Sequence, residues 1–420
     1  MALYVGLREK IGVEDEGDRS SAIRILTFTT LYPNEAQPHH GVFVENRLRH
    51  LLATGEVLTS VVAPVPWFPL RGEIFGRYSD LARVPSAETR NAITVYHPRY
   101  VVIPKIGMSA GPSNLFRATL GLIRRLKEQE NVAMIDAHYF YPDGVAAIML
   151  GEALDLPVII TARGTDINLI PAYFLPRRQI QYAARKAAGI IAVSQALADA
   201  LIALGIPSER VTVLRNGVDL HTFRPDDRDL ARKIIGVRGP TLLSVGHLIE
   251  RKGHDIVIAA LPALPGYTLL IAGDGPERSR LQTLTARLGV QDRVKFLGSV
   301  PHDHLRQTYE AADALVLASS REGWPNVLLE SMACGTPVIA SAIWGNPEVV
   351  SKPEAGILIK TRTPGGVAEG VKTLFRQLPS RAATRAFAER FSWHDTSVGQ
   401  LRLFRQVMET RNARRSAAED

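Results

Sequence analysis

Short apolar runs rich in β-branched residues alternate with helical stretches along this chain, and the whole alternating series occurs twice. The first series predicts strands at 23–30, 58–64, 133–138, 157–162 and 189–194. The second predicts strands at 241–247, 267–275, 294–300, 314–320 and 336–341. Strands joined by helical crossovers are typical of parallel sheets covered by helices. The sequence therefore predicts α/β architecture with two doubly wound domains, each binding ligands at the carboxyl ends of its strands.

The length of 420 residues agrees with two domains, because a single ordinary core rarely serves a chain of this size. We expect four segments along the chain. They are a flexible leader at 1–22, an N-terminal domain at 23–207, a C-terminal domain at 208–380, and a helical region at 381–420 that packs back toward the N-terminal domain and ends in a basic tail.

Composition narrows the cellular setting and the partners. The single cysteine, Cys334, excludes an internal disulfide, and the start of the chain lacks the pattern of a signal peptide, so we expect a cytoplasmic protein. No apolar run approaches the roughly 20 residues of a membrane span. The formal charge of +8 favours anionic partners such as sugar nucleotides or anionic lipid. No nucleic-acid-binding motif is found, so we expect no nucleic acid partner.

Two glutamates stand eight positions apart in REGWPNVLLESMACG, residues 321–335. Pro325 suits the first turn of a helix and Gly335 suits the position after its end, which predicts a helix at 325–334. The free N–H groups at such a helix start bind phosphate well. Glu330 lies among apolar residues, where a carboxylate requires a partner. That partner is either a ligand or a neighbouring arginine or backbone N–H.

This stretch resembles the E-x7-E signature of retaining glycosyltransferases of family 4, whose pattern EGWPNVLLESMACGTPVIAS and GNPEVV follow closely. Five further segments resemble blocks of that family in the family's order: RNGVDLHTFRP, LLSVGHLIERKGHDIVIAAL, LLIAGDGPERSRL, VKFLGSV and AADALVLASSREGWPN. The resemblance implies the GT-B fold, with two Rossmann-like doubly wound domains facing across a cleft. It also implies transfer of a sugar from a nucleotide diphosphate donor with retention at the anomeric carbon. In the N-terminal half, AHYFYPDG and TARGTDIN look like acceptor-side loops of members that build bacterial surface polysaccharides.

The resemblance assigns roles to residues of this chain. It implies that Glu322 approaches the hydroxyls of the donor sugar and that Glu330 accepts hydrogen bonds from the ribose. The catalytic candidates are His138, Lys252 and Glu322. The donor-binding candidates are His247, Arg251, Lys252, Gly273, Gly275, Val300, Glu322, Gly323, Trp324, Pro325, Asn326, Val327 and Glu330. The acceptor-side candidates are Gly41, Arg163 and Asp166.

Three positions leave alternatives open. The family usually has arginine where this chain has His247, so the missing charge comes from protonated His247 or from Arg251, or His247 orients a phosphate as a neutral donor. Arg163 either meets a phosphate or an anionic acceptor, or it forms an ion pair with Asp166. His138 either contacts the donor sugar or has a structural role.

We therefore expect a retaining, metal-independent hexosyltransferase that uses no cofactor other than its nucleotide-sugar donor. Its acceptor is expected to be a glycan or a lipid-linked oligosaccharide in bacterial polysaccharide synthesis. The DDRD run at 226–229 lies in a polar loop, so it predicts no metal site. The alternatives are a GT-B sugar-nucleotide epimerase and a non-catalytic protein that binds nucleotide sugars. The long loops at 31–42 and 64–79 favour an enzyme that has an acceptor.

A membrane surface is the last partner that the sequence indicates. The Pro-rich segment 63–78 combines three aromatic side chains, Trp67, Phe68 and Phe75, with two arginines. Aromatic rings beside cations suit shallow insertion into anionic lipid. We therefore expect peripheral attachment to the inner face of the cytoplasmic membrane, with packing of this loop on its own domain as the alternative.

Overall fold

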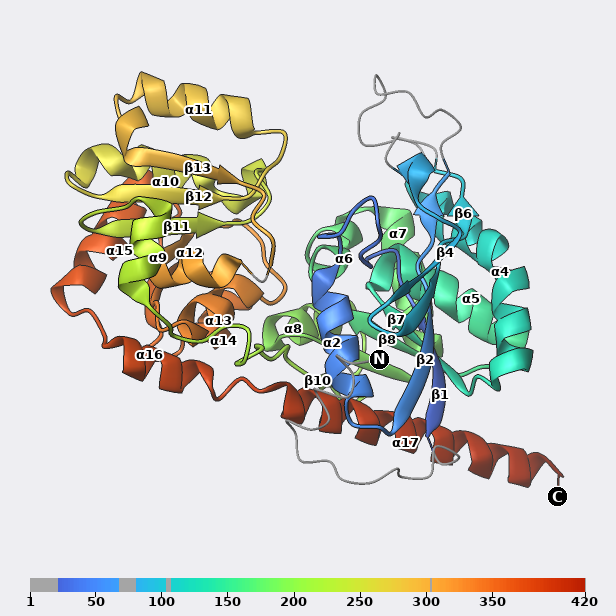
Figure 1. Ribbon diagram of the computed structural model, residues 1–420. Coiled ribbons are helices and arrows are strands. Elements are labelled where there is room, and N and C mark those ends of the chain that lie inside the picture. Colours follow the sequence, from blue (N-terminus) through green and yellow to red (C-terminus); the bar gives the residue numbers. More distant parts are fainter. Residues whose placement is uncertain (1–21, 68–80, 103–106, 303, 420) are drawn as a thin grey trace. The chain divides into compact units, whose positions relative to one another are not determined.

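In the computed structural model the chain divides into two compact units, which we describe separately (Figure 1). Unit 1 comprises Met1–Leu214 and His394–Asp420, and unit 2 comprises Arg215–Trp393. The structure describes residues 22–67, 81–102, 107–302 and 304–419. From the sequence we expected the N-terminal domain to end at residue 207. In the structure a short strand at Val211–Val213 pairs with the sheet of unit 1, so unit 1 continues to Leu214.

Unit 1 is built on an eight-stranded sheet with the order β10-β9-β8-β7-β1-β2-β5-β4. Its strands are β1 (Ile23–Phe28), β2 (Val57–Val62), β4 (Ala87–Arg90), β5 (Ile93–Tyr96), β7 (Met134–His138), β8 (Val158–Ala162), β9 (Gly189–Ala192) and β10 (Val211–Val213). Neighbouring strands pair in parallel, except that β4 runs antiparallel to β5 at one edge. A separate pair joins β3 (Val65–Pro66) and β6 (Arg99–Tyr100).

The α-helices described in unit 1 are α2 (Val42–Leu52), α4 (Gly111–Glu130), α5 (Val145–Leu154), α6 (Thr165–Asn168), α7 (Phe174–Lys186), α8 (Gln195–Ala203) and α17 (Trp393–Glu419). Short helical turns occur at η2 (Met108–Ala110), η3 (Phe140–Gly144), η4 (Ile170–Ala172) and η5 (Ser208–Arg210). One face of the sheet packs against α2 and α17, which share a single hydrophobic core with β1, β2, β5, β7, β8 and β9.

The helical region expected at 381–420 divides between the units: α16 (Arg381–Ala388) belongs to unit 2, and α17 is part of the core of unit 1. Leu401, Phe404 and Val407 recur every three residues and so lie on one face of the helix. All three are buried, and Phe404 is 0% exposed. Burial of each such side chain contributes about 1.5–3 kcal/mol. Helix α17 therefore completes the core of the unit that contains β1 and α2.

Unit 2 is a six-stranded, entirely parallel sheet with the order β13-β12-β11-β14-β15-β16. Its strands are β11 (Thr241–Val245), β12 (Thr268–Ala272), β13 (Val294–Gly298), β14 (Ala314–Leu317), β15 (Val338–Ser341) and β16 (Gly356–Ile359). Its helices are α9 (Arg228–Ile235), α10 (His254–Ala260), α11 (Arg278–Arg287), α12 (Leu305–Ala311), α13 (Asn326–Ala333), α14 (Asn346–Val349), α15 (Pro364–Arg376) and α16 (Arg381–Ala388), with turns η6 (Glu250–Lys252), η7 (Leu261–Ala263) and η8 (Gln291–Arg293). The strand order reverses between β11 and β14, which is where sheets of this type bind ligands.

The ten strands expected from the sequence correspond to β1, β2, β7, β8, β9 and β11 to β15, and the doubly wound α/β class is confirmed. The edge strand β4 was not expected. Its sequence is AETR and its side chains are exposed or half-buried, so it lacks the apolar signal of an inner strand. Strands β3, β5, β6, β10 and β16 were also missed, and each has only two to four residues.

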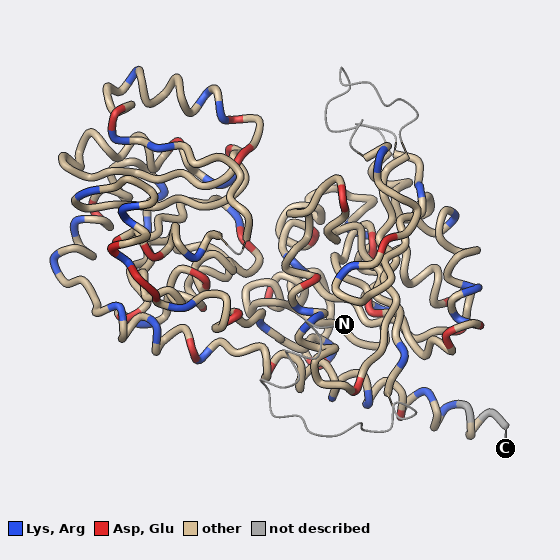
Figure 2. Tube along the Cα trace, in the orientation of Figure 1, with Lys and Arg blue, Asp and Glu red and all other residues tan. Residues whose placement is uncertain are grey.

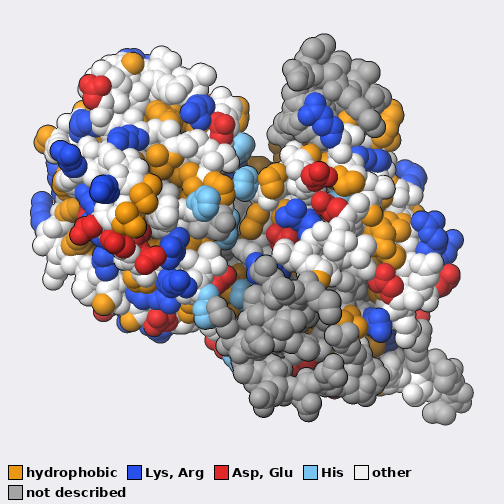
Figure 3. All heavy atoms as spheres, viewed as in Figure 1, with side chains coloured by type: hydrophobic (Ala, Val, Ile, Leu, Met, Phe, Trp, Pro, Cys, Tyr) orange, Lys and Arg blue, Asp and Glu red, His pale blue; other side chains and the backbone are white. Residues whose placement is uncertain are grey.

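Charged residues are distributed along both units. Figure 2 shows Lys and Arg interspersed with Asp and Glu along the trace of each unit. On the face drawn in Figure 3, basic and acidic side chains are likewise intermixed, so the positive net charge does not gather into one basic patch there. Among the described residues, no helix combines the length and the apolarity that crossing a bilayer requires.

Candidate functional site

The donor-binding candidates follow four neighbouring parallel strands of unit 2, and they lie in the loops after these strands or in helix α13. His247, Arg251 and Lys252 follow β11, Gly273 and Gly275 follow β12, Val300 follows β13, and residues 322–327 follow β14. Because the strands are parallel, these loops meet at one edge of the sheet. The structure thus brings residues from a span of more than 70 positions to the carboxyl edge of one sheet.

An ion pair between Lys252 and Glu322 lies at this edge. The Lys252 Nζ is 2.7 Å from Glu322 Oε1, and the Ser319 hydroxyl donates to the same oxygen at 2.7 Å. The Arg251 guanidinium is 3.7 Å from Glu322 Oε2. Burial alone would raise the pKa of the Glu322 carboxyl, but Lys252 and Arg251 outweigh burial and lower it. Glu322 is therefore an ionised carboxylate in a largely buried site.

Two glycines allow the loops to approach each other. Gly253 follows Lys252 with φ of 71°, and a Cβ there would overlap the carbonyl oxygen of Ala318 at the end of β14. Gly273 has φ of 145°, and a Cβ would overlap the carbonyl oxygen of Gly246 after β11. Both positions require glycine because of their backbone angle and this close contact. The first contact sets Lys252 beside the loop that carries Glu322.

His247 and Arg251 have different surroundings. The His247 side chain is exposed on the loop after β11, next to Gly275. Arg251 donates from Nη1 to the carbonyl of Arg321 at 2.8 Å, in addition to its contact with Glu322. Arg251 is thus fixed beside the Lys252–Glu322 pair. Which of the two residues supplies the charge of the family's arginine stays a prediction.

Glu330 has two protein partners that the sequence analysis did not name. The Tyr309 hydroxyl donates to Glu330 Oε2 at 2.8 Å, and His302 Nε2 lies 3.1 Å from Oε1. The rings of Phe223 and His302 meet edge to face at 5.0 Å. The partners expected from the sequence were a ligand, an arginine or a backbone N–H. A carboxylate has about four lone-pair positions, so these two bonds leave Glu330 able to accept from a ligand.

The segment between the glutamates holds the start of α13. Trp324 donates from Nε1 to the carbonyl of Asn216 at 3.0 Å and is buried, which gives it a packing role within unit 2. Helix α13 begins at Asn326, one residue later than expected, and Pro325 makes no side-chain cap. Gly323 and Pro325 are buried, and Val327 is half-buried. No side chain caps the first turn of α13, although the Asn326 and Leu328 N–H groups donate to the carbonyls of Trp324 and Pro325. The amino end of α13 follows Glu322 by four residues, and a helix start favours negative charge.

In unit 1, His138 and Arg163 meet at the carboxyl ends of β7 and β8. The Arg163 Nη2 lies 2.7 Å from His138 Nδ1, and Asp136 Oδ2 lies 3.4 Å from His138 Nε2. Burial lowers the pKa of His138 to about 4, Asp136 opposes that shift, and Arg163 adds to it. His138 is therefore a neutral imidazole at neutral pH. Asp136 was not singled out from the sequence, although a charged residue two positions before His138 in an apolar strand was a signal for it.

Asp166 holds the loop after β8. Its carboxylate accepts hydrogen bonds from the backbone N–H groups of Phe140 at 2.6 Å, Gly164 at 2.6 Å and Arg163 at 3.1 Å. Burial raises its pKa despite these bonds. Asp166 thus binds the main chain of this loop, while the Arg163 guanidinium is directed to His138.

Gly41, the third acceptor-side candidate, precedes α2 with φ of 71° and packs against the backbone of Leu31.

A further buried carboxyl lies near these residues. Asp143 accepts hydrogen bonds from the Thr30 N–H at 2.6 Å, the Thr30 hydroxyl at 3.0 Å and the Thr29 hydroxyl at 3.3 Å. Burial raises its pKa to about 7, although the bonds from the two threonines act in the opposite direction. Asp143 connects η3 to the end of β1, and its proton equilibrium lies in the physiological range.

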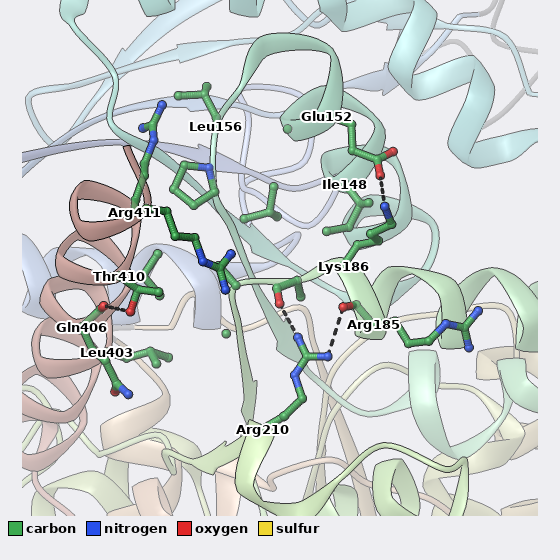
Figure 4. Close-up of a pocket in the computed structure, with 18 of the residues that line it drawn as sticks. Ile148, Glu152, Leu156, Arg185, Lys186, Arg210, Leu403, Gln406, Thr410 and Arg411 are labelled. Atoms are coloured by element: carbon green, nitrogen blue, oxygen red, sulfur yellow. Dashed lines mark hydrogen bonds and ion pairs between the residues drawn. The ribbon is translucent and has the colours of Figure 1, made fainter. Parts of the chain in front are cut away.

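Unit 1 also contains a cavity of about 880 Å³ beside the amino ends of β8 and β9 (Figure 4). Three of its basic side chains, Lys186, Arg210 and Arg411, have protein partners. Lys186 pairs with Glu152 at 3.1 Å, Arg411 pairs with Asp155 at 3.1 Å, and Arg210 donates to two backbone carbonyls at the end of α7. These bonds tie α5, α7 and α17 together, so these three cations have a structural role.

The segment expected to contact lipid, 63–78, falls largely outside the described residues, and so do loop 64–79 and the leader 1–22 for the most part. Within the described part of the chain, no group of three or more His, Cys, Asp or Glu side chains is arranged to hold a metal ion. In the DDRD run, Asp227 caps α9 and Asp226 pairs with Arg306.

Two family models match the chain. Residues 46–222 match the model described as Glycosyltransferase Family 4, and residues 227–391 match the model described as Glycosyl transferases group 1. TuaC of Bacillus subtilis (strain 168), assigned to teichuronic acid biosynthesis, is 29% identical over 358 residues, which cover 83% of this chain and 88% of TuaC. D-inositol 3-phosphate glycosyltransferase of Mycobacterium tuberculosis (strain ATCC 25177 / H37Ra) is 35% identical over 226 residues, which cover 50% of this chain and 47% of that relative.

Solved structures share the fold at low identity. Sucrose-phosphate synthase from Thermosynechococcus elongatus superimposes with a TM-score of 0.74 at 20% identity, covering 93% of this chain and 100% of that one. Anabaena Alr3699/HepE, solved in complex with UDP and glucose, gives a TM-score of 0.70 at 21% identity and covers 91% and 99%. These likenesses, with the two family models, confirm the GT-B fold that the sequence predicted.

The raised pKa of Asp143 predicts a pH-dependent stability. Folding raises this pKa from 3.8 to about 7, so between these values the folded protein holds a proton that the unfolded chain releases. As the pH rises from about 4 to about 7, the free energy of unfolding should therefore fall by up to about 1.4 kcal/mol for each pH unit. Asp143→Asn is neutral at every pH and should remove this slope.

The measurement is chemical unfolding of wild type and variant at a series of pH values. Asp199→Asn, an exposed aspartate of α8, is the matched control and should keep the wild-type slope. If Asp143→Asn unfolds with the same pH dependence as wild type, the buried carboxyl does not hold the proton.

Proposed function

Because this chain belongs to the GT-B glycosyltransferases, with a family 4 domain followed by a group 1 domain, we propose that it transfers a sugar with retention from a nucleotide diphosphate to a glycan or lipid-linked acceptor. The observation that carries this proposal is the Lys252–Glu322 ion pair beside the uncapped start of α13. Cations beside the amino end of a helix suit a diphosphate, and a carboxylate in the same place suits sugar hydroxyls.

The donor is proposed to bind along α13. The diphosphate contacts the first turn of α13 and Lys252, which offset the negative charge that grows as the nucleoside diphosphate departs. Glu322 accepts from hydroxyls of the donor sugar. Glu330 lies about one turn further along α13 and accepts from the ribose while Tyr309 and His302 hold its carboxylate in place.

Retention is proposed to proceed by departure and attack on the same face of the sugar. A double displacement would need a carboxylate nucleophile under the anomeric carbon, and the one carboxylate proposed to touch the sugar, Glu322, is ion-paired with Lys252. In the same-face route the departing diphosphate oxygen takes the acceptor proton, so no protein base is required. The diphosphate is stabilised by Lys252 and α13, which makes the reaction independent of metal.

A panel of nucleotide sugars, incubated with and without acceptor extracts, tests the function. We expect release of the nucleoside diphosphate that depends on acceptor, persists in EDTA, and gives a product with the anomeric configuration of the donor. UDP-glucose is the first donor to try, because Anabaena Alr3699/HepE was solved with UDP-glucose. Conversion of the donor sugar without any acceptor would instead indicate an epimerase, and binding without turnover of any donor would indicate a non-catalytic protein.

The acceptor is proposed to belong to bacterial polysaccharide synthesis. TuaC, which aligns over most of both chains, is assigned to teichuronic acid biosynthesis. The 35% identical mycobacterial relative is named for inositol 3-phosphate, and its alignment covers only about half of each chain. The longer alignment therefore favours a glycan or a lipid-linked oligosaccharide over a small phosphorylated alcohol.

A binding experiment should distinguish the roles of Glu322 and Glu330. Glu330→Gln keeps the shape but weakens the bonds to the ribose, so it should weaken binding of the bare nucleoside diphosphate by about 1–2 kcal/mol, as expected for a charged hydrogen bond. Glu322→Gln should leave that affinity near wild type, because the amide oxygen still accepts from Lys252, while turnover falls steeply.

Isothermal titration calorimetry with the diphosphate measures this difference, since the ligand carries no sugar. Glu369→Gln, an exposed glutamate of α15, is the control and should change neither quantity. Equal loss of affinity in both active-site variants would contradict the assignment of separate roles. Unchanged binding in Glu330→Gln would show that this carboxylate serves only the packing with Tyr309 and His302.

Reversible attachment to an anionic membrane is proposed from the surface of unit 1. Trp67 is 53% exposed, and at the start of α7 Phe174 and Leu175 are 68% and 56% exposed. Arg177 and Arg178 follow on the same exposed turn, and the Arg178 guanidinium lies over the Phe174 ring. Exposed apolar side chains beside cations match the chemistry of an anionic lipid surface.

Flotation with vesicles that contain anionic lipid tests the attachment. Wild type should float at low salt and be released at high salt. The double variant Phe174→Ser, Leu175→Ser should lose most of this binding, whereas Ile234→Ser, which alters a 59% exposed side chain of α9 in unit 2, should not. Absence of salt-sensitive flotation in the wild type would remove the proposal.

A further inference from the structure

A continuous series of buried polar side chains crosses unit 1 from its C-terminal helix to the end of β8. It comprises Arg47 of α2, Gln400 of α17, Asp136 and His138 of β7, and Arg163 after β8. The Arg47 Nε donates to Gln400 Oε1 at 2.9 Å, and Gln400 Nε2 donates to Asp136 Oδ2 at 2.8 Å. Asp136 Oδ2 then lies 3.4 Å from His138 Nε2, and His138 Nδ1 lies 2.7 Å from Arg163 Nη2.

The chemistry of the two arginines fixes every donor and acceptor in between. A guanidinium only donates, so Gln400 must present its oxygen to Arg47 and its NH₂ to Asp136. In the same way His138 Nδ1 must accept from Arg163, which leaves the proton of the neutral ring on Nε2, where it is donated to Asp136. The two ends of the series thus impose a single tautomer on His138.

Exposure distinguishes the members of this series. Arg47, Asp136, Gln400 and His138 are each 0% or 1% exposed, whereas Arg163, in the loop after β8, is the most exposed member at 7%. The Phe43 ring of α2 lies 5.6 Å from the Arg163 guanidinium. Both nitrogens of His138 are occupied by protein groups, so only Arg163 can carry the effect of this series to a substrate.

We propose that His138 is a positioning residue that holds the Arg163 guanidinium for the substrate, and that Asp136 and Gln400 of α17 hold His138 in the required tautomer. This inference rests on the proposed glycosyl transfer. It differs from the role that the family resemblance implied for His138, which was direct contact with the donor sugar. It also gives the C-terminal helix a part in the reaction, through Gln400.

The tautomer can be measured without any activity. In protein labelled with ¹⁵N-histidine, and with His138→Gln used to assign the signal, the His138 ring at pH 7.5 should be neutral with its proton on Nε2. A proton on Nδ1, or a charged ring, would overturn the inference. This measurement remains decisive even if no donor in the panel gives product, an outcome that would count against the proposed function alone.

Two substitutions at His138 distinguish its two nitrogens. The oxygen of an asparagine lies near the position of Nδ1 and can still accept from Arg163, while a glutamine reaches only the position of Nε2. His138→Asn should therefore keep kcat within about tenfold of wild type, and His138→Gln should lose about 10- to 100-fold, the scale of one hydrogen bond to a charged group. The reverse order would contradict a role through Arg163.

A double-mutant cycle tests whether His138 acts through Arg163. If it does, His138→Gln should lower kcat strongly in the wild type but by less than about twofold once Arg163 is Met, because the two changes remove one interaction. Additive losses would instead show that His138 reaches the substrate independently. Circular dichroism and thermal unfolding of each variant show that the comparison is made among folded proteins.

Gln400 has a matched control on its own helix. Gln400→Met removes the bonds to Arg47 and Asp136 with little change of volume, and should lower kcat about tenfold with little effect on KM for the donor. Gln406→Met makes the same change at an exposed position of α17 and should leave kcat unchanged. Equal kcat in these two variants would exclude Gln400 from the positioning series.

Discussion

Parallel strand pairing is the constraint on which the arrangement of this protein depends. In each unit, parallel strands bring the loops that follow them to one edge of the sheet, whatever their separation in the chain. Polar side chains accumulate there because the strands themselves are buried and apolar. In unit 2 that edge carries Lys252 and Glu322, and in unit 1 it carries His138, Arg163 and Asp166. The chemistry proposed for the chain follows from this shared geometry.

Buried carboxyl groups are the cost of gathering these side chains, and they are compensated in more than one way. In unit 2 a cation lies directly beside the carboxylate, so Glu322 stays ionised. In unit 1 Asp166 and Asp143 accept hydrogen bonds from neutral donors, and burial raises the pKa of both. The difference has a physical reason, since a full positive charge at 2.7 Å compensates desolvation better than N–H and O–H dipoles do.

Much of the fold and part of the candidate site were predictable from sequence, because their signals are local. Pro325 and Gly335 predicted a helix at 325–334, and each bound is within one residue of the observed helix α13, Asn326–Ala333. The partners of Glu330 were not predictable. Tyr309 lies in α12 and His302 in the loop before it, and neither stands at a spacing that relates it to Glu330. Only the packing of α12 against α13 brings the Tyr309 hydroxyl to the carboxylate.

The amino-acid sequence by itself determined the two doubly wound domains and the residue types at the ends of their strands, because periodicity and turn residues act over a few positions. Tertiary structure decided which of those residues meet. Gln400 and Asp136 are 264 positions apart, and they are joined because α17 returns to the core of unit 1 through Leu401 and Phe404. Burial of these apolar side chains stabilises the packing of α17 in unit 1. The hydrogen bonds around His138 then determine its tautomer. No pattern along the chain encodes a contact made in this way.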